Sequence, residues 1–256
     1  WAPDISYSDG RFYITATLRC NDDSVEKRVQ MVTSSTSPEG PYSKPSWIHD
    51  DGIDPSLFHD DDGKKYMLLN RGARIFQLSS DCSEKIGEAS LLWLGVCRKN
   101  PDGPRVMKKD GYYYLFLAEG GTGMGHRVTV ARSKTLYGPY EPCPHNPIVR
   151  QNDESQLLQC CGHGMVVDTP EGDWYIAYLT LRRSKDGYGF TGRETCIDPL
   201  VWDKDGWPLV NGGKGPGVFS RIPKKTKSTK EYPDAEYYPA WKNKLWNTPR
   251  ALSLDK

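Results

Sequence analysis

Four apolar segments rich in aromatic residues recur along the chain, and each directly follows an acidic residue and a glycine. They are RFYITATL after Asp9-Gly10, KKYMLLN after Asp62-Gly63, YYYLFLA after Asp110-Gly111 and DWYIAYL after Glu171-Gly172. An acid-glycine pair between alternating apolar runs is a strong local signal for a β-hairpin. The pattern therefore predicts four hairpins. Because no segment sustains a helical period, it also predicts an all-β protein.

The hairpins recur at a spacing typical of propeller blades. Successive acid-glycine pairs lie 53, 48 and 61 residues apart, close to the roughly 50 residues of one blade. A Gly-Pro-Tyr motif agrees, since its copies at 40–42 and 138–140 lie 98 residues apart, which is two periods. Residues 216–256 carry no fifth hairpin signal, and we expect them to pack on the propeller or to lead to another domain. We predict a β-propeller over residues 1–215 with blades at about 1–48, 49–95, 96–147 and 148–215.

The repeat also predicts which side chains meet. Eight positions before each hairpin acid stand Trp1, Asp54, Asp102 and His163. Equivalent positions on the innermost strands of a propeller converge on its axis, so an indole, two carboxylates and an imidazole are expected to face one another. A core built only for packing does not gather such groups, because a buried charge is costly unless it is paired or bound to a metal. The register therefore indicates a functional site.

Charge and composition narrow the partners. The 34 Lys and Arg against 33 Asp and Glu leave a formal charge of +1, which argues against nucleic acid or an anionic membrane. No apolar run approaches the roughly 20 residues of a membrane-spanning helix. The 15 Tyr and 8 Trp suit a carbohydrate site, but they suit a β-rich core equally well. The seven cysteines, odd in number and without a Cys-x-x-Cys pair, are expected to be buried structural thiols.

Five motifs, which cover most of the chain, give the sequence a specific resemblance. They are WAPDI at 1–5, DGIDPSLF at 51–58, the stretch DGPRV to VARS at 102–133, GHGMVVDTPEGDWY at 162–175 and GRETCIDPLVWDKDGWPLVNGG at 192–213. With these motifs the sequence resembles glycoside hydrolase family 43, and the stretches around GGTG and GRET are most similar to its β-xylosidase and α-L-arabinofuranosidase branches. The resemblance implies a five-bladed propeller that hydrolyses xylose or arabinofuranose linkages of plant hemicellulose from the chain end with inversion.

The resemblance also implies roles for individual residues. Asp102 stands at the position of the general acid, where the family has Glu, and Asp54 matches the Asp that orients this acid and tunes its pKa. Arg193 matches an arginine that binds sugar hydroxyls, and Trp1 matches a ring near that pocket. His163 matches an axial histidine that holds a calcium ion or a water cluster through water, so Ca²⁺ in the central channel is the only cofactor expected.

Two departures from the family pattern limit this expectation. The blade that precedes WAPDI in the family, with the general base at its start, has no counterpart in these residues, and Trp1 falls within an expected strand. We therefore expect the natural N-terminus to lie upstream. The acid Asp102 is also one methylene short, and misplacing a catalytic group by about 1 Å can reduce the rate on the order of 100-fold. Inverting hydrolysis needs both carboxyl groups, so residues 1–256 alone are expected to be impaired.

A second interpretation stays open beside the enzyme: a non-catalytic propeller that binds pentose glycans, or a degenerate family member. Either way the expected partner is a xylo- or arabino-oligosaccharide, with no nucleic acid and no membrane. The sequence does not indicate an oligomeric state. Localisation is not determined, with a secreted or periplasmic location favoured over a cytoplasmic one.

Other polar residues receive simpler interpretations. Glu119 either lines the pocket or caps a strand end, and His126 is a candidate substrate contact. Glu194 is expected to be the salt-bridge partner of Arg193. The glycine-rich run at 120–123 is not followed by a helix pattern or the lysine of a P-loop, so it does not indicate a phosphate site.

Overall fold

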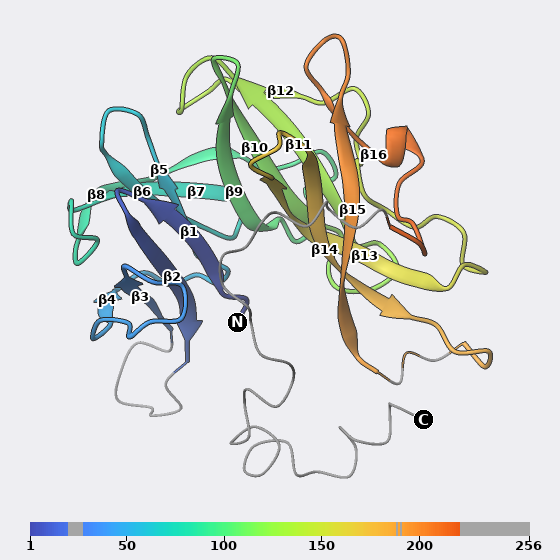
Figure 1. Cartoon of the computed structure of the whole chain (residues 1–256), viewed down its shortest axis with the longest axis horizontal. Coiled ribbons are helices and arrows are strands. Elements are labelled where there is room, and N and C mark those ends of the chain that lie inside the picture. The colour runs from blue at the N-terminus through green and yellow to red at the C-terminus, as the bar shows by residue number, and fades with distance from the viewer. Residues whose placement is uncertain (20–27, 188, 190, 221–256) are drawn as a thin grey trace.

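The computed structural model describes residues 1–19, 28–187, 189 and 191–220, and these form four antiparallel sheets of four strands each. In each sheet the strands are neighbours in chain order (Figure 1). A short 3₁₀ helix, η1 (Asn211–Gly213), follows the last strand. The first sheet contains β1 (Asp4–Ser8), β2 (Arg11–Leu18), β3 (Val29–Ser35) and β4 (Ser46–Ile48). The second contains β5 (Ser56–His59), β6 (Lys65–Leu69), β7 (Ala73–Leu78) and β8 (Lys85–Trp93). The third contains β9 (Asp102–Lys109), β10 (Tyr112–Glu119), β11 (Arg127–Ser133) and β12 (Glu141–Pro142). The fourth contains β13 (Leu158–Asp168), β14 (Trp174–Arg182), β15 (Arg193–Trp202) and β16 (Pro208–Val210).

The four predicted hairpins are confirmed, each joining the first two strands of a sheet. Asp9 and Gly10 both adopt positive φ, as do Asp110 and Gly111, which is the conformation of a two-residue type I′ turn. The Gly-Pro-Tyr repeat is also structural. Tyr42 and Tyr140 each donate their hydroxyl to the carbonyl of the residue four positions earlier.

The sheets follow one another around the molecule from the first to the fourth (Figure 1). Their innermost strands contact in the same order, β1 against β5, β5 against β9 and β9 against β13. Three apolar clusters lie between successive sheets, built around Met67, Leu117 and Val128 respectively. The described residues thus form a four-bladed, propeller-like arrangement. They do not include the fifth blade that the resemblance implies, and the predicted extension beyond residue 220 lies outside them.

The inner and outer sheets differ in how they are covered. Every residue of β6 is buried, because its sheet packs between two others. In the first sheet, Asp4 and Ser6 face the second sheet, whereas Ile5 and Tyr7 point away and stay 45% and 62% exposed. On β15 of the fourth sheet, Ile197 and Val201 are exposed in the same way. Both ends of the array therefore expose apolar side chains on a sheet face.

The cysteines only partly follow the expectation of buried thiols. Cys82, Cys143 and Cys161 are buried, but Cys97 is exposed, and all six described cysteines are free. Cys20 lies outside the described residues. No helix among the described residues is long and apolar enough to cross a membrane.

Candidate active site

The six residues singled out from the sequence line one cavity of about 750 Å³. Five of them sit at strand entrances: Trp1 lies just before β1, Asp54 before β5 and His126 before β11, while Asp102 opens β9 and Arg193 opens β15. His163 lies within β13. The structure thus brings together every residue of the prediction, whereas the roles assigned to them stay predictions. The six are Trp1, Asp54, Asp102, His126, His163 and Arg193.

Asp54, which lines the cavity, is held in an unusual backbone conformation. Its φ of 58° lies in the left-handed region, which non-glycine residues adopt rarely and which recurs at functional sites. The side chain is buried. Burial raises the pKa of this carboxyl, and hydrogen bonds from the backbone of Gly103 and Ala2 oppose the rise only in part. The environment therefore favours the protonated form more than water does.

Asp102 lies beside Asp54 and is perturbed in the same direction. Burial is the main cause that raises its pKa, and the negative charge of Asp54 adds to it. The Asn70 amide, whose Nδ2 donates to Oδ1 of Asp102 at 3.1 Å, opposes the rise. A carboxyl whose pKa is raised by burial and by a neighbouring carboxylate is the arrangement that suits a general acid.

Two glycines make room for the imidazole rings. A Cβ on Gly103 would lie 2.6 Å from Nε2 of His163, and one on Gly162 would lie 2.4 Å from Cδ2 of His126. The rings therefore occupy space that any other residue would fill. His126 Nδ1 lies 2.9 Å from the Cys160 carbonyl, which can only accept, so the proton is on Nδ1 and Nε2 is an acceptor. Burial lowers the pKa of His126, and it lowers that of His163 to about 4, so both rings are neutral near pH 7.

The surroundings of His163 do not suit direct calcium coordination. Calcium takes six to eight oxygen ligands, but the described residues hold no cluster of three or more His, Cys, Asp or Glu that could bind a metal. A cation is already nearby: the Arg105 guanidinium, ion-paired with the buried Asp4, lowers the pKa of His163 through its charge. Any Ca²⁺ would have to bind through water and against this positive charge.

Glu119 is in the cavity wall but is fully committed to the fold. Its carboxylate accepts hydrogen bonds from the backbone of residues 96, 97 and 98 at 2.8–2.9 Å and from Thr129 Oγ1 at 2.5 Å. Burial acts to raise its pKa, but the hydrogen bonds led by that of Thr129 outweigh burial and leave the pKa lowered. Glu119 therefore caps a loop at the end of β10, in agreement with the structural interpretation.

The prediction of a salt bridge between Glu194 and Arg193 is wrong. Glu194 Oε2 accepts from Arg182 Nη2 at 2.7 Å, across the β14–β15 pair, and Thr191 donates to its other oxygen. Successive residues of a strand point to opposite faces of the sheet. The side chains of Arg193 and Glu194 therefore lie on opposite faces and do not form an ion pair. Arg193 instead lines the cavity, where its positive charge opposes the rise in the pKa of Asp54 and adds to the lowering of the pKa of both histidines.

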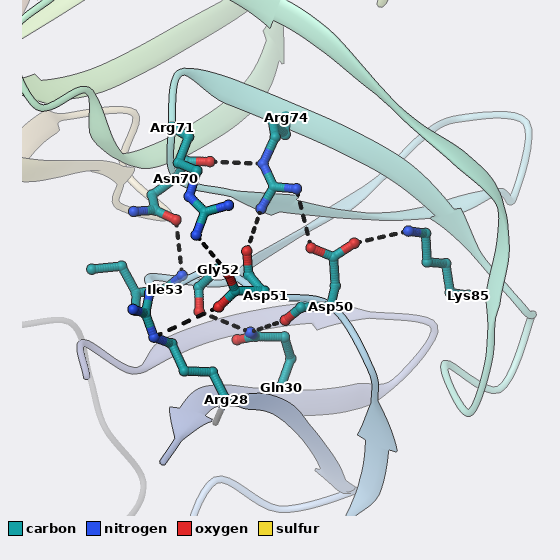
Figure 2. Close-up of polar contacts among 10 residues, drawn as sticks. All are labelled: Arg28, Gln30, Asp50, Asp51, Gly52, Ile53, Asn70, Arg71, Arg74 and Lys85. Atoms are coloured by element: carbon teal, nitrogen blue, oxygen red, sulfur yellow. Dashed lines mark hydrogen bonds and ion pairs between the residues drawn. The ribbon is translucent and has the colours of Figure 1, made fainter. Parts of the chain in front are cut away.

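The residues that sequence reasoning missed are those that hold the carboxyls in place. Asn70, directly after β6, contacts Asp102, and the segment 50–53 leads into Asp54. Figure 2 shows how densely this segment is held: Arg74 and Lys85 bind the two carboxylate oxygens of Asp50 at 3.1 and 2.8 Å. The available signal was weak, a polar residue and two arginines after the apolar run KKYMLL.

Comparisons with known proteins agree with this architecture. The family model described as "Glycosyl hydrolases family 43" matches residues 1–208. A β-xylosidase of Bacillus subtilis is 39% identical over 236 residues, which cover 84% of this chain and 44% of the relative. A non-reducing end α-L-arabinofuranosidase of Bacteroides ovatus is 36% identical over 214 residues, covering 82% and 40%.

Solved structures show the same relation. The crystal structure of the GH43 BlXynB protein from Bacillus licheniformis superposes with a TM-score of 0.85 at 48% identity, over 90% of this chain and 46% of that one. The chain thus spans about half the length of the relatives that it matches.

Proposed function

The chain belongs to glycosyl hydrolases family 43, and on that premise we propose that the whole protein removes terminal xylose or arabinofuranose residues from hemicellulose oligosaccharides. The observation that supports this most directly is the pair of neighbouring carboxyls, Asp54 and Asp102, whose pKa values are both raised in one cavity. A β-xylosidase and an α-L-arabinofuranosidase among the relatives support the same substrate class.

In the proposed reaction Asp102 donates its proton to the leaving glycosidic oxygen while a water attacks the opposite face of the sugar. Burial raises the pKa of Asp102, and the neighbouring charge of Asp54 adds to this effect, as a general acid requires. Inverting hydrolysis also needs a general base, with the two carboxyls roughly 6.5 to 9.5 Å apart to admit the water. We assign the base to a fifth blade of the whole protein. The exposed apolar faces of the first and fourth sheets are where such a blade would pack.

Substrate recognition is assigned to three residues of the cavity. Arg193 supplies a planar set of donors suited to vicinal hydroxyls. Trp1 offers an aromatic face, 49% exposed, against which a sugar ring can stack. His126 presents Nε2 as an acceptor for a sugar hydroxyl, because its Nδ1 is held by the Cys160 carbonyl. A cation near His163 would be bound through water and is given no step in the reaction.

The test is hydrolysis by the whole natural protein of 4-nitrophenyl β-xyloside and 4-nitrophenyl α-L-arabinofuranoside, with the anomer of the first product read by NMR. We expect turnover with inversion and little activity from residues 1–256 alone. Retention of configuration, or full turnover by residues 1–256 alone, would contradict the assignment of the base.

The shortened acid favours a second candidate, a propeller that binds pentose glycans without cleaving them. Asp102 reaches less far than the Glu that the family resemblance implies at this position. If this is correct, calorimetry with xylo-oligosaccharides will show binding by the whole protein, while prolonged incubation releases no sugar. Binding without hydrolysis would replace the enzymatic proposal.

A further inference from the structure

We propose that Asn70 is a positioning residue for the general acid: it ties Oδ1 of Asp102 to the segment that carries Asp54, and so directs the acid proton to Oδ2. The inference rests on the proposed function, because it assumes that Asp102 acts as the acid. It adds a residue that neither the hairpin register nor the family motifs indicate.

The hydrogen bonds of Asn70 fix the orientation of its amide. The backbone N–H of Ile53 donates to Asn70 Oδ1 at 2.9 Å, and Asn70 Nδ2 donates to Asp102 Oδ1 at 3.1 Å. A backbone N–H can only donate, so the oxygen of the amide must face Ile53 and the amino group must face Asp102. Asn70 is buried, and its backbone N–H donates to the Ile53 carbonyl at 3.1 Å. The side chain is therefore locked at both ends.

This orientation has a consequence for the proton. Because Oδ1 of Asp102 already accepts from Asn70, a proton held by the carboxyl resides on Oδ2, the oxygen left to reach a substrate. An amide suits this task better than a cation, because a neutral donor opposes the raised pKa of Asp102 without reversing it. A short acid also depends more on being held in one direction, since small misplacements reduce rates steeply.

The segment to which Asn70 ties the acid is itself rigidly held (Figure 2). Gln30 Nε2 donates to the carbonyls of Asp50 and Gly52 at 2.9 and 3.0 Å. Arg74 donates to the Asp50 carboxylate and to the backbone carbonyl of Asn70. A Cβ on Gly52 would lie 2.8 Å from Arg74 Nη2 and 3.1 Å from Leu69 Cβ, so Arg74 and Leu69 pack closely against the backbone of this segment. Asn70 thus connects Asp102 to the same rigid segment that leads into Asp54.

The decisive variant is Asn70→Asp in the whole protein. The new side chain keeps an acceptor for Ile53 N–H and nearly the same shape, but it cannot donate to ionised Asp102. We compare two xylosides, one with a dinitrophenol leaving group that needs no protonation and one with an alkyl alcohol that needs it fully. We expect kcat on the alkyl xyloside to fall by about 10- to 100-fold, and the dinitrophenyl substrate to change less than about threefold.

The pH profile gives an independent readout. Removing a donor and adding a like charge both raise the pKa of Asp102. A general acid works while protonated, so the basic limb of the kcat profile on the alkyl substrate should move to higher pH. An Asp102 carboxyl carbon signal titrated by NMR should move the same way even if the protein proves inactive, which separates this inference from the proposed function.

Asn146→Ala is the matched control. Asn146 also locks its amide between backbone groups, accepting from Val130 N–H at 2.8 Å and donating to the Val130 carbonyl at 2.7 Å, but it does not line the cavity. It should lower stability and leave the ratio between the two substrates unchanged. Equal losses on both substrates in Asn70→Asp, or an unmoved Asp102 titration, would overturn the proposal.

Discussion

Two carboxyl environments meet in one cavity, and they are opposite in kind. On one side, Asp54 is buried and Asp102 half-buried, both with few donors and with raised pKa values. On the other, Glu119 is more deeply buried but has a lowered pKa. Burial acts in the same direction at all three, so it cannot explain the difference. The difference lies in the number of donors, since three backbone N–H groups and one hydroxyl meet Glu119.

Under the proposed function, the contrast separates carboxyls that take part in the reaction from one that stabilises the fold. A carboxylate that is stabilised by many hydrogen bonds holds its charge and has no proton to give. A carboxyl left short of donors retains its proton toward neutral pH, at a cost in stability. Loss of a carboxylate with many donors should therefore destabilise the protein, whereas loss of a carboxyl with few donors should remove its activity.

The largest expected effect is that of Asp102→Asn on catalysis. Because the amide cannot donate an acidic proton, kcat of the whole protein on an alkyl xyloside should fall by about 100- to 10,000-fold. The free energy of unfolding at pH 7 should stay equal or rise, because a carboxyl whose pKa is raised by folding lowers stability at that pH. Urea denaturation beside the kinetic assay checks both halves. A stability loss as large as that of a core substitution would show that Asp102, like Glu119, stabilises the fold.

Glu119→Gln should give the opposite result, a protein that is less stable. Its amide would present an N–H₂ group to two of the four donors that now meet the carboxylate. We expect a loss of about 2–4 kcal/mol in the free energy of unfolding. The exposed Glu141→Gln, with 66% of the Glu141 side chain accessible, is the control and should change stability by less than about 0.5 kcal/mol. A Glu119→Gln protein of normal stability and low kcat would invert the comparison.

Much of this contrast could not have been predicted from the sequence, although the fold largely could. The acid-glycine hairpins and their spacing predict the four sheets because a turn is encoded by adjacent residues. The shared position eight residues before each hairpin acid predicts that Asp54 and Asp102 meet, because equivalent positions of the repeat converge. It contains no information on Asn70, whose contact with Asp102 spans 32 residues between two sheets. Nor does the motif around Glu119 reveal its donors, which come from the loop at 96–98.

The third prediction tests the reach of the acid. Asp102→Glu restores the methylene that the family resemblance implies, and we expect kcat on an alkyl xyloside to rise by about 10-fold in the whole protein. The longer side chain must then give up or bend its contact with Asn70, so stability should not rise with activity. A lower kcat would show that the cavity is built around the shorter acid.

Acidification should remove the stability contrast, with an effect of about 1 kcal/mol. Asp54 has a raised pKa in the folded state, so Asp54→Asn should stabilise the protein at pH 7. This advantage should vanish as the pH falls through the folded pKa toward the ordinary value of 3.8. Glu119 has a lowered pKa, so the stability lost in Glu119→Gln should be present above pH 4.5 and shrink as the pH falls below it. Urea titrations at several pH values measure both, and parallel curves would contradict the assignment of opposite shifts.

The smallest effect is expected from calcium. Positive charge near His163 comes from Arg105, which is paired with Asp4, and from Arg193, and the described residues offer no set of metal ligands. Millimolar CaCl₂ or EDTA should therefore shift the Tm of the whole protein by less than about 1 °C, since only a ligand that binds the folded state raises stability. Arg105→Met removes the guanidinium and leaves Asp4 without its ion pair. If calcium stabilises this variant and not the parent, the Arg105 guanidinium takes the place of a cation on the propeller axis. A calcium-dependent Tm in the parent protein would show instead that a water-bound ion coexists with Arg105, and that Asp102 is tuned by a charge in addition to Asp54.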